Sequence, residues 1–166
     1  MSFSKHWKRI AVAAAASLAL LAGGMSVVAS TAAAAPAPAA AQIAGTIVML
    51  PPTRIADSRI VLSFMTFHAV EQQDLQIVGR GGVPMTGVAG VILNVTAVGG
   101  QQGGYLTVWP VDQSRPNTSN VNFQAGQDIA NTVIVSLPQP DGTVSIFNGS
   151  YGDTDVLVDV EGYIVG

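Results

Sequence analysis

The stretch AGVILNVTAVGGQQGGYLTVW, residues 89–109, decides the fold. It holds two runs of β-branched and aromatic residues on either side of a glycine-rich segment. In the second run Leu106 and Val108 fall on one face of an extended chain, and Tyr105 and Trp109 fall on the other. This alternation is typical of strands that bury one face. We therefore expect two antiparallel strands joined by a glycine-rich hairpin loop.

The same pattern recurs on both sides of this stretch, and it predicts an all-β chain. Asp141 and Gly142 form a second hairpin signal, and no segment shows a long helical period. The antiparallel β-sandwich is the expected fold. Because residues 130–147 resemble residues 89–109, a β-trefoil or β-prism built from repeated hairpins is the alternative. Residues 62–75 are expected to form a short helix or an irregular loop. The expected strands are 46–50, 54–57, 75–78, 88–98, 105–109, 119–123, 131–137, 143–147 and 156–165.

The N-terminus carries the features of a secretory signal peptide. Lys5, Lys8 and Arg9 precede an uncharged, Ala-rich run at residues 10–28, and small residues follow at 29–35. This order predicts a signal peptide over residues 1–30 that is cleaved between Ala29 and Ala35. A membrane anchor is the alternative, because the run approaches the ~20 residues that span a bilayer. We expect a secreted protein, extracellular or associated with the cell wall.

Residues 31–44 contain mostly Ala and Pro and predict an extended spacer. Residues 45–166 then form a single all-β domain. This domain has no Lys and only four Arg against all ten acidic residues of the chain, which gives a formal charge of −6. Nucleic acids and anionic lipids are poor partners for such a domain, because binding their phosphates needs clustered cations. The absence of Cys excludes disulfides and, with the Ala-rich leader, suggests a high-GC Gram-positive bacterial exporter.

Seven strings in sequence order resemble an accessory domain common in secreted actinobacterial proteins. The domain's pattern includes P-x-R-L-L-D-T-R, L-N-V-T, G-Y-L-T-V-x-P, S-x-L-N-F and D-V-x-G-Y-F. The resemblance covers nearly the whole chain after the leader and implies a module without assigned catalysis. The chain departs from the pattern at Ile55-Ala56, at Ser58, at residues 60–68 and at Ile164. The strings are PPTRIADSR (51–59), GRGGVP (79–84), GVILNVTAV (90–98), GGYLTVWP (103–110), RPNTSNVNFQAGQDIANTVIV (115–135), DGTVSIFN (141–148) and DVLVDVEGYIV (155–165).

The sequence offers little catalytic chemistry. His68 is the only His after the leader, and no G-x-S-x-G motif surrounds a Ser. Asp159 and Glu161 share one face of a single strand, so their spacing does not place two acids across a glycosidic bond. Asp153 and Asp155 are weak calcium candidates that lack EF-hand spacing. We therefore expect no enzyme activity, no cofactor and no metal site.

Four charged residues instead predict a structural network. Arg54 and Arg59 flank Asp57 near the start of the domain, and Asp159 lies in the last strand. Arg guanidinium groups form bidentate hydrogen bonds with carboxylates. We expect these residues to form partly buried ion pairs that join the first and last strands.

Carbohydrate binding is the most specific functional expectation. Tyr105, Trp109 and Phe147 are candidates to stack on sugar rings, with Asn120 and Asn122 as amide partners. The alternative is that the aromatic residues are packed in the core. We expect an exported, non-catalytic binding module for cell-wall or other extracellular glycan. The alternative function is a structural or adhesive module that contacts proteins.

Overall fold

The computed structural model describes residues 45–60, 62, 63 and 65–166. Strands form where buried and exposed side chains alternate along the sequence, as they do over much of β3, β6 and β8. The elements are β1 (Ile47–Asp57), η1 (Ser58–Ile60, a 3₁₀ turn), β2 (Gln72–Gln76), β3 (Val88–Val98), β4 (Gly104–Pro110), β5 (Val121–Phe123), β6 (Ile129–Ser136), β7 (Thr143–Asn148) and β8 (Asp155–Val165).

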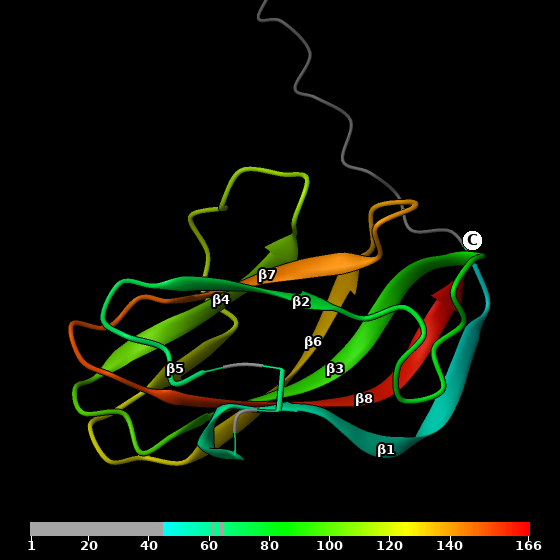
Figure 1. Ribbon diagram of the computed structural model, residues 1–166. Helices are drawn as coiled ribbons and strands as arrows, with labels where there is room; N and C mark the ends of the chain where they lie inside the picture. Colours follow the sequence, from blue (N-terminus) through cyan, green and yellow to red (C-terminus); the bar gives the residue numbers. More distant parts are fainter. Residues whose placement is uncertain (1–44, 61, 64) are drawn as a thin grey trace, which may run out of the picture. The chain divides into compact units, whose positions relative to one another are not determined.

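The strands form two antiparallel sheets that lie one over the other (Figure 1). One sheet has the order β1-β8-β3-β6 and the other has the order β2-β7-β4-β5. The pairing is nested, since β1 pairs with β8, β2 with β7, β3 with β6 and β4 with β5. This is the strand order of a jelly roll, a double-sheet form of the β-sandwich.

The expected antiparallel sandwich is confirmed, but the trefoil and prism alternatives are wrong. Both alternatives need repeated hairpins, whereas β3 and β4 lie in different sheets, and so do β6 and β7. The glycine-rich loop at residues 99–104 and the turn at Asp141-Gly142 are therefore crossings between sheets. Alternation shows that a strand buries one face, but it does not show which strand lies beside it. The only hairpin between consecutive strands of one sheet is β4–β5, within the described residues.

Most strand positions agree with the prediction, and β3 matches at both ends. The predicted strands at 46–50 and 54–57 form one strand, β1, with a register shift between Met49 and Thr53. Strand β2 starts at Gln72, three residues before the expected start at Leu75. Its early residues are polar because it is an edge strand with one face toward solvent. In the segment 62–75, for which a short helix or an irregular loop is expected, the described residues before Gln72 form an irregular loop, and the rest belongs to β2. The 3₁₀ turn η1 lies before this segment.

The hydrophobic core lies between the two sheets. It contains the alternate residues that the pattern assigned inward, including Leu106 and Val108 on β4 and Val133 and Val135 on β6. Phe67 comes from the segment between η1 and β2, and it is also fully buried. Burial of this many aliphatic side chains stabilises the domain without disulfides.

The described residues belong to one compact unit. The expected signal peptide and spacer, residues 1–30 and 31–44, lie outside the described residues. Within the described part of the chain, no helix is long and apolar enough to span a bilayer.

Candidate binding site

A loop covers the outer face of the β2-β7-β4-β5 sheet. We call residues 111–120, which connect β4 to β5, the β4–β5 loop. The indole Nε1 of Trp109 donates a hydrogen bond of 3.0 Å to the carbonyl of Gln113. The hydroxyl of Thr107 donates one of 2.6 Å to the carbonyl of Thr118. Both donors are outward residues of β4, so the loop lies over that strand.

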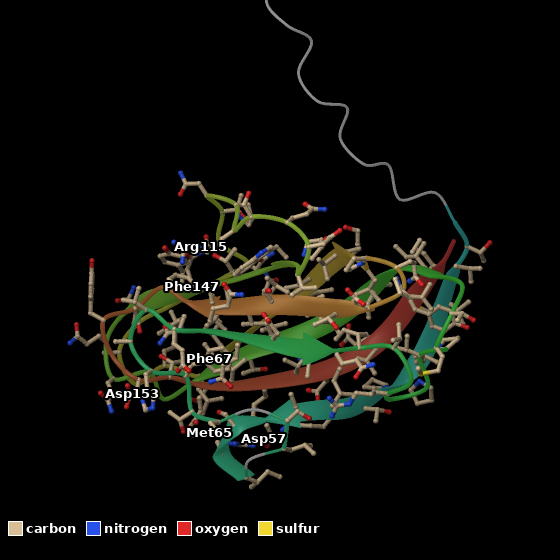
Figure 2. The ribbon with its side chains drawn as sticks, turned by 45° about the horizontal axis from the view of Figure 1, so that its top comes forward. Asp57, Met65, Phe67, Arg115, Phe147 and Asp153 are labelled. Atoms are coloured by element: carbon tan, nitrogen blue, oxygen red, sulfur yellow. The ribbon has the colours of Figure 1, made fainter. Side chains whose placement is uncertain are left out.

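Arg115 fixes the middle of the loop against the same sheet. Its guanidinium carbon lies 3.7 Å from the centroid of the Phe147 ring, and Figure 2 shows the two residues together. A guanidinium over an aromatic face is attracted by the ring's quadrupole. Phe147 also contacts Tyr105, with ring centroids 6.3 Å apart. The loop cation is thereby connected through Phe147 to Tyr105.

Asn120 fixes the end of the loop through both its backbone and its side chain. Its backbone N–H donates to the carbonyl of Leu106 at 2.8 Å, and its Oδ1 accepts from the N–H of Val108 at 2.7 Å. Its own carbonyl accepts from Nδ2 of Asn131 at 2.7 Å. These bonds hold the loop in one conformation, so any site that it forms is preorganised.

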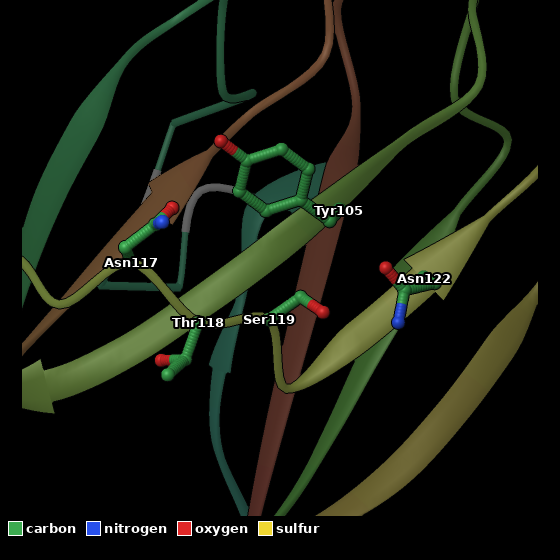
Figure 3. A pocket seen from close by; sticks show the side chains of 5 residues that line it. All are labelled: Tyr105, Asn117, Thr118, Ser119 and Asn122. Carbon is green, nitrogen blue, oxygen red and sulfur yellow. The ribbon is translucent and has the colours of Figure 1, made fainter.

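The loop and the strands beneath it form a pocket of about 240 Å³. Tyr105 comes from β4 and Asn122 from β5, while the other lining residues come from the end of the loop (Figure 3). The lining is one partly exposed aromatic ring together with uncharged polar side chains. Its members are Tyr105, Asn117, Thr118, Ser119 and Asn122.

The polar groups of this pocket keep their hydrogen-bonding capacity for a ligand. No described residue forms a hydrogen bond with the side chains of Asn117, Ser119 or Asn122, or with the hydroxyl of Tyr105. Amides and hydroxyls both donate and accept hydrogen bonds. A ligand that presents several hydroxyl groups and an apolar face would match this lining.

The Tyr105 ring is positioned by Gly149. The N–H of Gly149 donates to the carbonyl of Tyr105 at 2.8 Å, and the ring lies directly over the glycine. A Cβ at residue 149 would lie 2.2 Å from Cζ of Tyr105. Only glycine permits this approach of the ring to the backbone.

Of the five residues predicted to bind a ligand, two line the pocket and three do not. Tyr105 and Asn122 line the pocket together. Trp109 and Phe147 are wrong as sugar-stacking residues, because they are only 4% and 5% exposed. They point outward from the sheet as alternation requires, but the β4–β5 loop covers them. Asn120 uses its side-chain oxygen within the protein and lies outside the Tyr105 pocket.

Asn117, Thr118 and Ser119 are lining residues that the sequence reasoning missed. Asn117 and Thr118 lie between the predicted strands at 105–109 and 119–123, and Ser119 is the first residue of the second of these strands. The signal for them was the run RPNTSN at residues 115–120, which is polar and rich in turn-forming residues. Binding residues are often found on such loops when a rigid scaffold positions them.

The four residues predicted to form ion pairs lie together at β1, η1 and β8. Arg54 binds Asp159 through Nε at 2.7 Å and Nη2 at 3.0 Å, which is a bidentate contact across paired strands. Asp57 accepts from Arg54 at 3.3 Å and from Nη2 and Nε of Arg59 at 2.8 and 3.0 Å. The network therefore joins the first strand to the last.

Asp57 remains ionised well into the acid range. Its side chain is buried, and the hydrogen bonds from the Arg59 side chain lower its pKa to about 2. Burial alone would raise the pKa of this carboxyl, but the backbone N–H of Arg59 and the guanidinium of Arg54 add to the lowering. This network holds strands together and does not line the Tyr105 pocket.

The other residues considered for catalysis or calcium binding, His68, Asp153 and Asp155, contact other side chains of the protein. The exposed His68 lies with Nδ1 3.3 Å from a carboxylate oxygen of Asp153. The Oδ1 atom of Asp155 accepts hydrogen bonds from the hydroxyls of Ser58 and Thr66, at 2.7 and 3.0 Å. Across the described residues, no group of three or more His, Cys, Asp or Glu side chains is placed to hold a metal ion.

No protein-family model, curated protein or solved structure matches the chain.

Proposed function

We propose that this protein is an exported, non-catalytic module that binds uncharged glycan of a cell wall or extracellular matrix in the Tyr105 pocket. The observation that carries the proposal is the composition of the lining. A tyrosine ring faces the same pocket as two amides and two hydroxyl side chains, none of which is charged. Sugars are complementary to this lining, because their C–H faces pack on aromatic rings and their hydroxyls form hydrogen bonds with amides.

The fixed β4–β5 loop supports the proposal. Sugar ligands are strongly hydrated, so a binding site must replace their hydrogen bonds to water with well-placed partners. The hydrogen bonds of Trp109, Thr107 and Asn120 and the Arg115–Phe147 contact hold the loop before ligand arrives. Less entropy is then lost on binding.

Charge narrows the class of glycan. The domain carries a formal charge of −6, no lining residue is charged, and the cation of the β4–β5 loop, Arg115, lies over the Phe147 ring. An anionic polymer would meet net repulsion and no free cation in the lining. A neutral polysaccharide is not repelled by the net charge and needs no cation in the pocket. The absence of a carboxylate or imidazole among the lining residues supports binding rather than bond cleavage.

The leader supports the location of this function. A positive n-region, an apolar run and small residues precede the domain, as in exported proteins. Extracellular polysaccharides are among the polymers that a secreted domain meets there.

The test is co-sedimentation of the purified protein with insoluble cellulose, chitin, xylan and peptidoglycan. We expect saturable binding to at least one of them, and we expect Tyr105→Ala and Asn122→Ala to abolish it. Tyr151→Ala and Thr132→Ala are matched controls, because both residues are exposed and neither lines the Tyr105 pocket. Absence of binding to all four polymers, or equal binding by the pocket variants, would overturn the proposal.

A further inference from the structure

A second pocket lies on the other side of β5. Its volume is about 280 Å³, and Asn122 lines both pockets. β5 is the edge strand of one sheet and β6 is the edge strand of the other, so the second pocket lies at an open edge of the sandwich. Its lining residues are Asn120, Val121, Asn122, Ile129, Ala130 and Asn131.

The chemistry of the second pocket resembles that of the first. Three amides converge on it, and aliphatic carbon from β5 and β6 completes the lining without any charge. Two of the amides are fixed in place, since Asn131 donates to the carbonyl of Asn120 and Asn120 accepts from Val108. The side chain of Asn122, at the boundary between the pockets, has no hydrogen-bond partner among the described residues.

We propose that the two pockets are adjacent subsites for consecutive units of one glycan chain, an inference that rests on the proposed function. The Tyr105 pocket would take one unit against the aromatic ring, and the second pocket would take the next unit against Ile129 and Ala130. Asn122 would contact both units or the linkage between them. The ligand class is therefore a neutral oligosaccharide or polysaccharide, rather than a single sugar.

Two features of the pockets favour an internal segment of a chain over a chain end. Both pockets are open to solvent, so neither blocks the continuation of a polymer beyond it. The shared residue places them next to each other across a strand of only three residues, β5. A site that recognises a single terminal sugar would instead enclose it in one pocket.

Calorimetric titration with cello-, xylo- and chito-oligosaccharides of one to six units tests this inference on the purified protein. In the series that binds, we expect affinity to increase at least about tenfold between one unit and two or three units, and to change little with further length. Additional contacts in the second pocket account for the increase.

Ala130→Gln separates the two subsites. Ala130 is exposed and lines only the second pocket, so a longer side chain there fills that pocket and leaves Tyr105 and Asn117 unchanged. We expect this variant to bind single sugars as the parent does, but to lose the gain from longer chains. Ala130→Ser is the matched control, because its side chain is too short to fill the pocket, and unfolding curves of both variants check the fold.

The outcomes distinguish this inference from the function on which it rests. If the parent binds one unit as tightly as six, or if Ala130→Gln binds hexasaccharide as the parent does, the second subsite is wrong and glycan binding stands. If no oligosaccharide series and no insoluble polysaccharide binds, both proposals are overturned.

Discussion

The guanidinium carbon of Arg115 lies over the ring of Phe147, 3.7 Å from its centroid, and this contact holds the β4–β5 loop over the outer face of a sheet. Arg115→Ala should therefore loosen the loop that supplies three of the five pocket residues. We expect a loss of about 0.5–2 kcal/mol in the free energy of unfolding, measured by urea denaturation, together with weaker glycan binding. Unchanged stability and unchanged binding would show that the contact does not position the loop.

Trp109 is a second support for the loop, and its side chain is buried beneath it. Trp109→Ala should lower the free energy of unfolding by about 3–5 kcal/mol, as for other buried aromatic residues. Trp109→Phe removes the hydrogen bond to Gln113 but keeps much of the buried ring, so its expected cost is about 1 kcal/mol. Circular dichroism during urea denaturation measures both. Full stability of Trp109→Ala with lost glycan binding would instead return Trp109 to the ligand surface.

The outcome at Trp109 shows how far the sequence predicts this molecule. Alternation along β4 assigned Leu106 and Val108 to the core and Trp109 to the opposite face, and both assignments are correct. Alternation describes a strand and its two faces, and it carries no information about a loop that lies over one face. The burial of Trp109 and Phe147 depends on residues 111–120, whose path is set by hydrogen bonds of backbone and side-chain groups to β4 and by Arg115.

The nested strand order was unpredictable for a related reason. The segment at 99–104 and the turn at Asp141-Gly142 have the composition of hairpin turns, but both cross between sheets. Whether such a segment forms a hairpin or crosses between sheets depends on pairing between strands far apart in sequence, since β3 pairs with β6 and β8. The ion pair between Arg54 and Asp159 was easier to predict, because both residues lie in strands and their opposite charges favour contact.

Gly149 offers a test of the pocket in which none of the lining residues is substituted. In Gly149→Ala the new Cβ would lie 2.2 Å from Cζ of Tyr105, so the ring must move. The tip of this partly exposed ring can turn away at small cost to the fold. We expect glycan binding to weaken about tenfold or more, while the thermal unfolding midpoint changes little. Gly126→Ala is a control with a free Cβ position, although its positive φ adds backbone strain.

If Gly149→Ala binds glycan as the parent does, the position of the Tyr105 ring is not part of the recognition. If Gly149→Ala unfolds, Tyr105→Phe tests the hydroxyl of the same residue without disturbing the backbone. We expect Tyr105→Phe to retain the fold and to bind more weakly than the parent, because one hydrogen bond to the ligand is lost.

The lowered pKa of Asp57 predicts how the stability of the domain depends on pH. Hydrogen bonds from Arg59 lower the pKa of Asp57 from 3.8 to about 2 in the folded protein. A lowered folded-state pKa contributes stability that is fully present above the unfolded-state pKa and is lost as the pH falls through the folded-state value. We therefore expect the unfolding midpoint to decrease as the pH is lowered from about 4 toward about 2.

Asp57→Asn tests the source of this pH dependence. It should be less stable than the parent above pH 4, and its midpoint should change less below that pH. Asp141→Asn is the matched control, because the Asp141 side chain is exposed and forms no ion pair among the described residues. A parent and Asp57→Asn variant with parallel pH profiles would exclude Asp57 as the responsible group.

The most direct test of glycan binding in the Tyr105 pocket is a nuclear magnetic resonance titration that follows the side-chain amide signals of the asparagines. The ¹⁵N-labelled protein is titrated with cellohexaose, xylohexaose and chitohexaose in turn. With at least one of them, the signals of Asn117 and Asn122 should shift saturably, while that of Asn148, buried and bonded to three backbone carbonyls, should not. Saturable shifts confined to other parts of the domain, or no shifts with any of the three, would contradict the account.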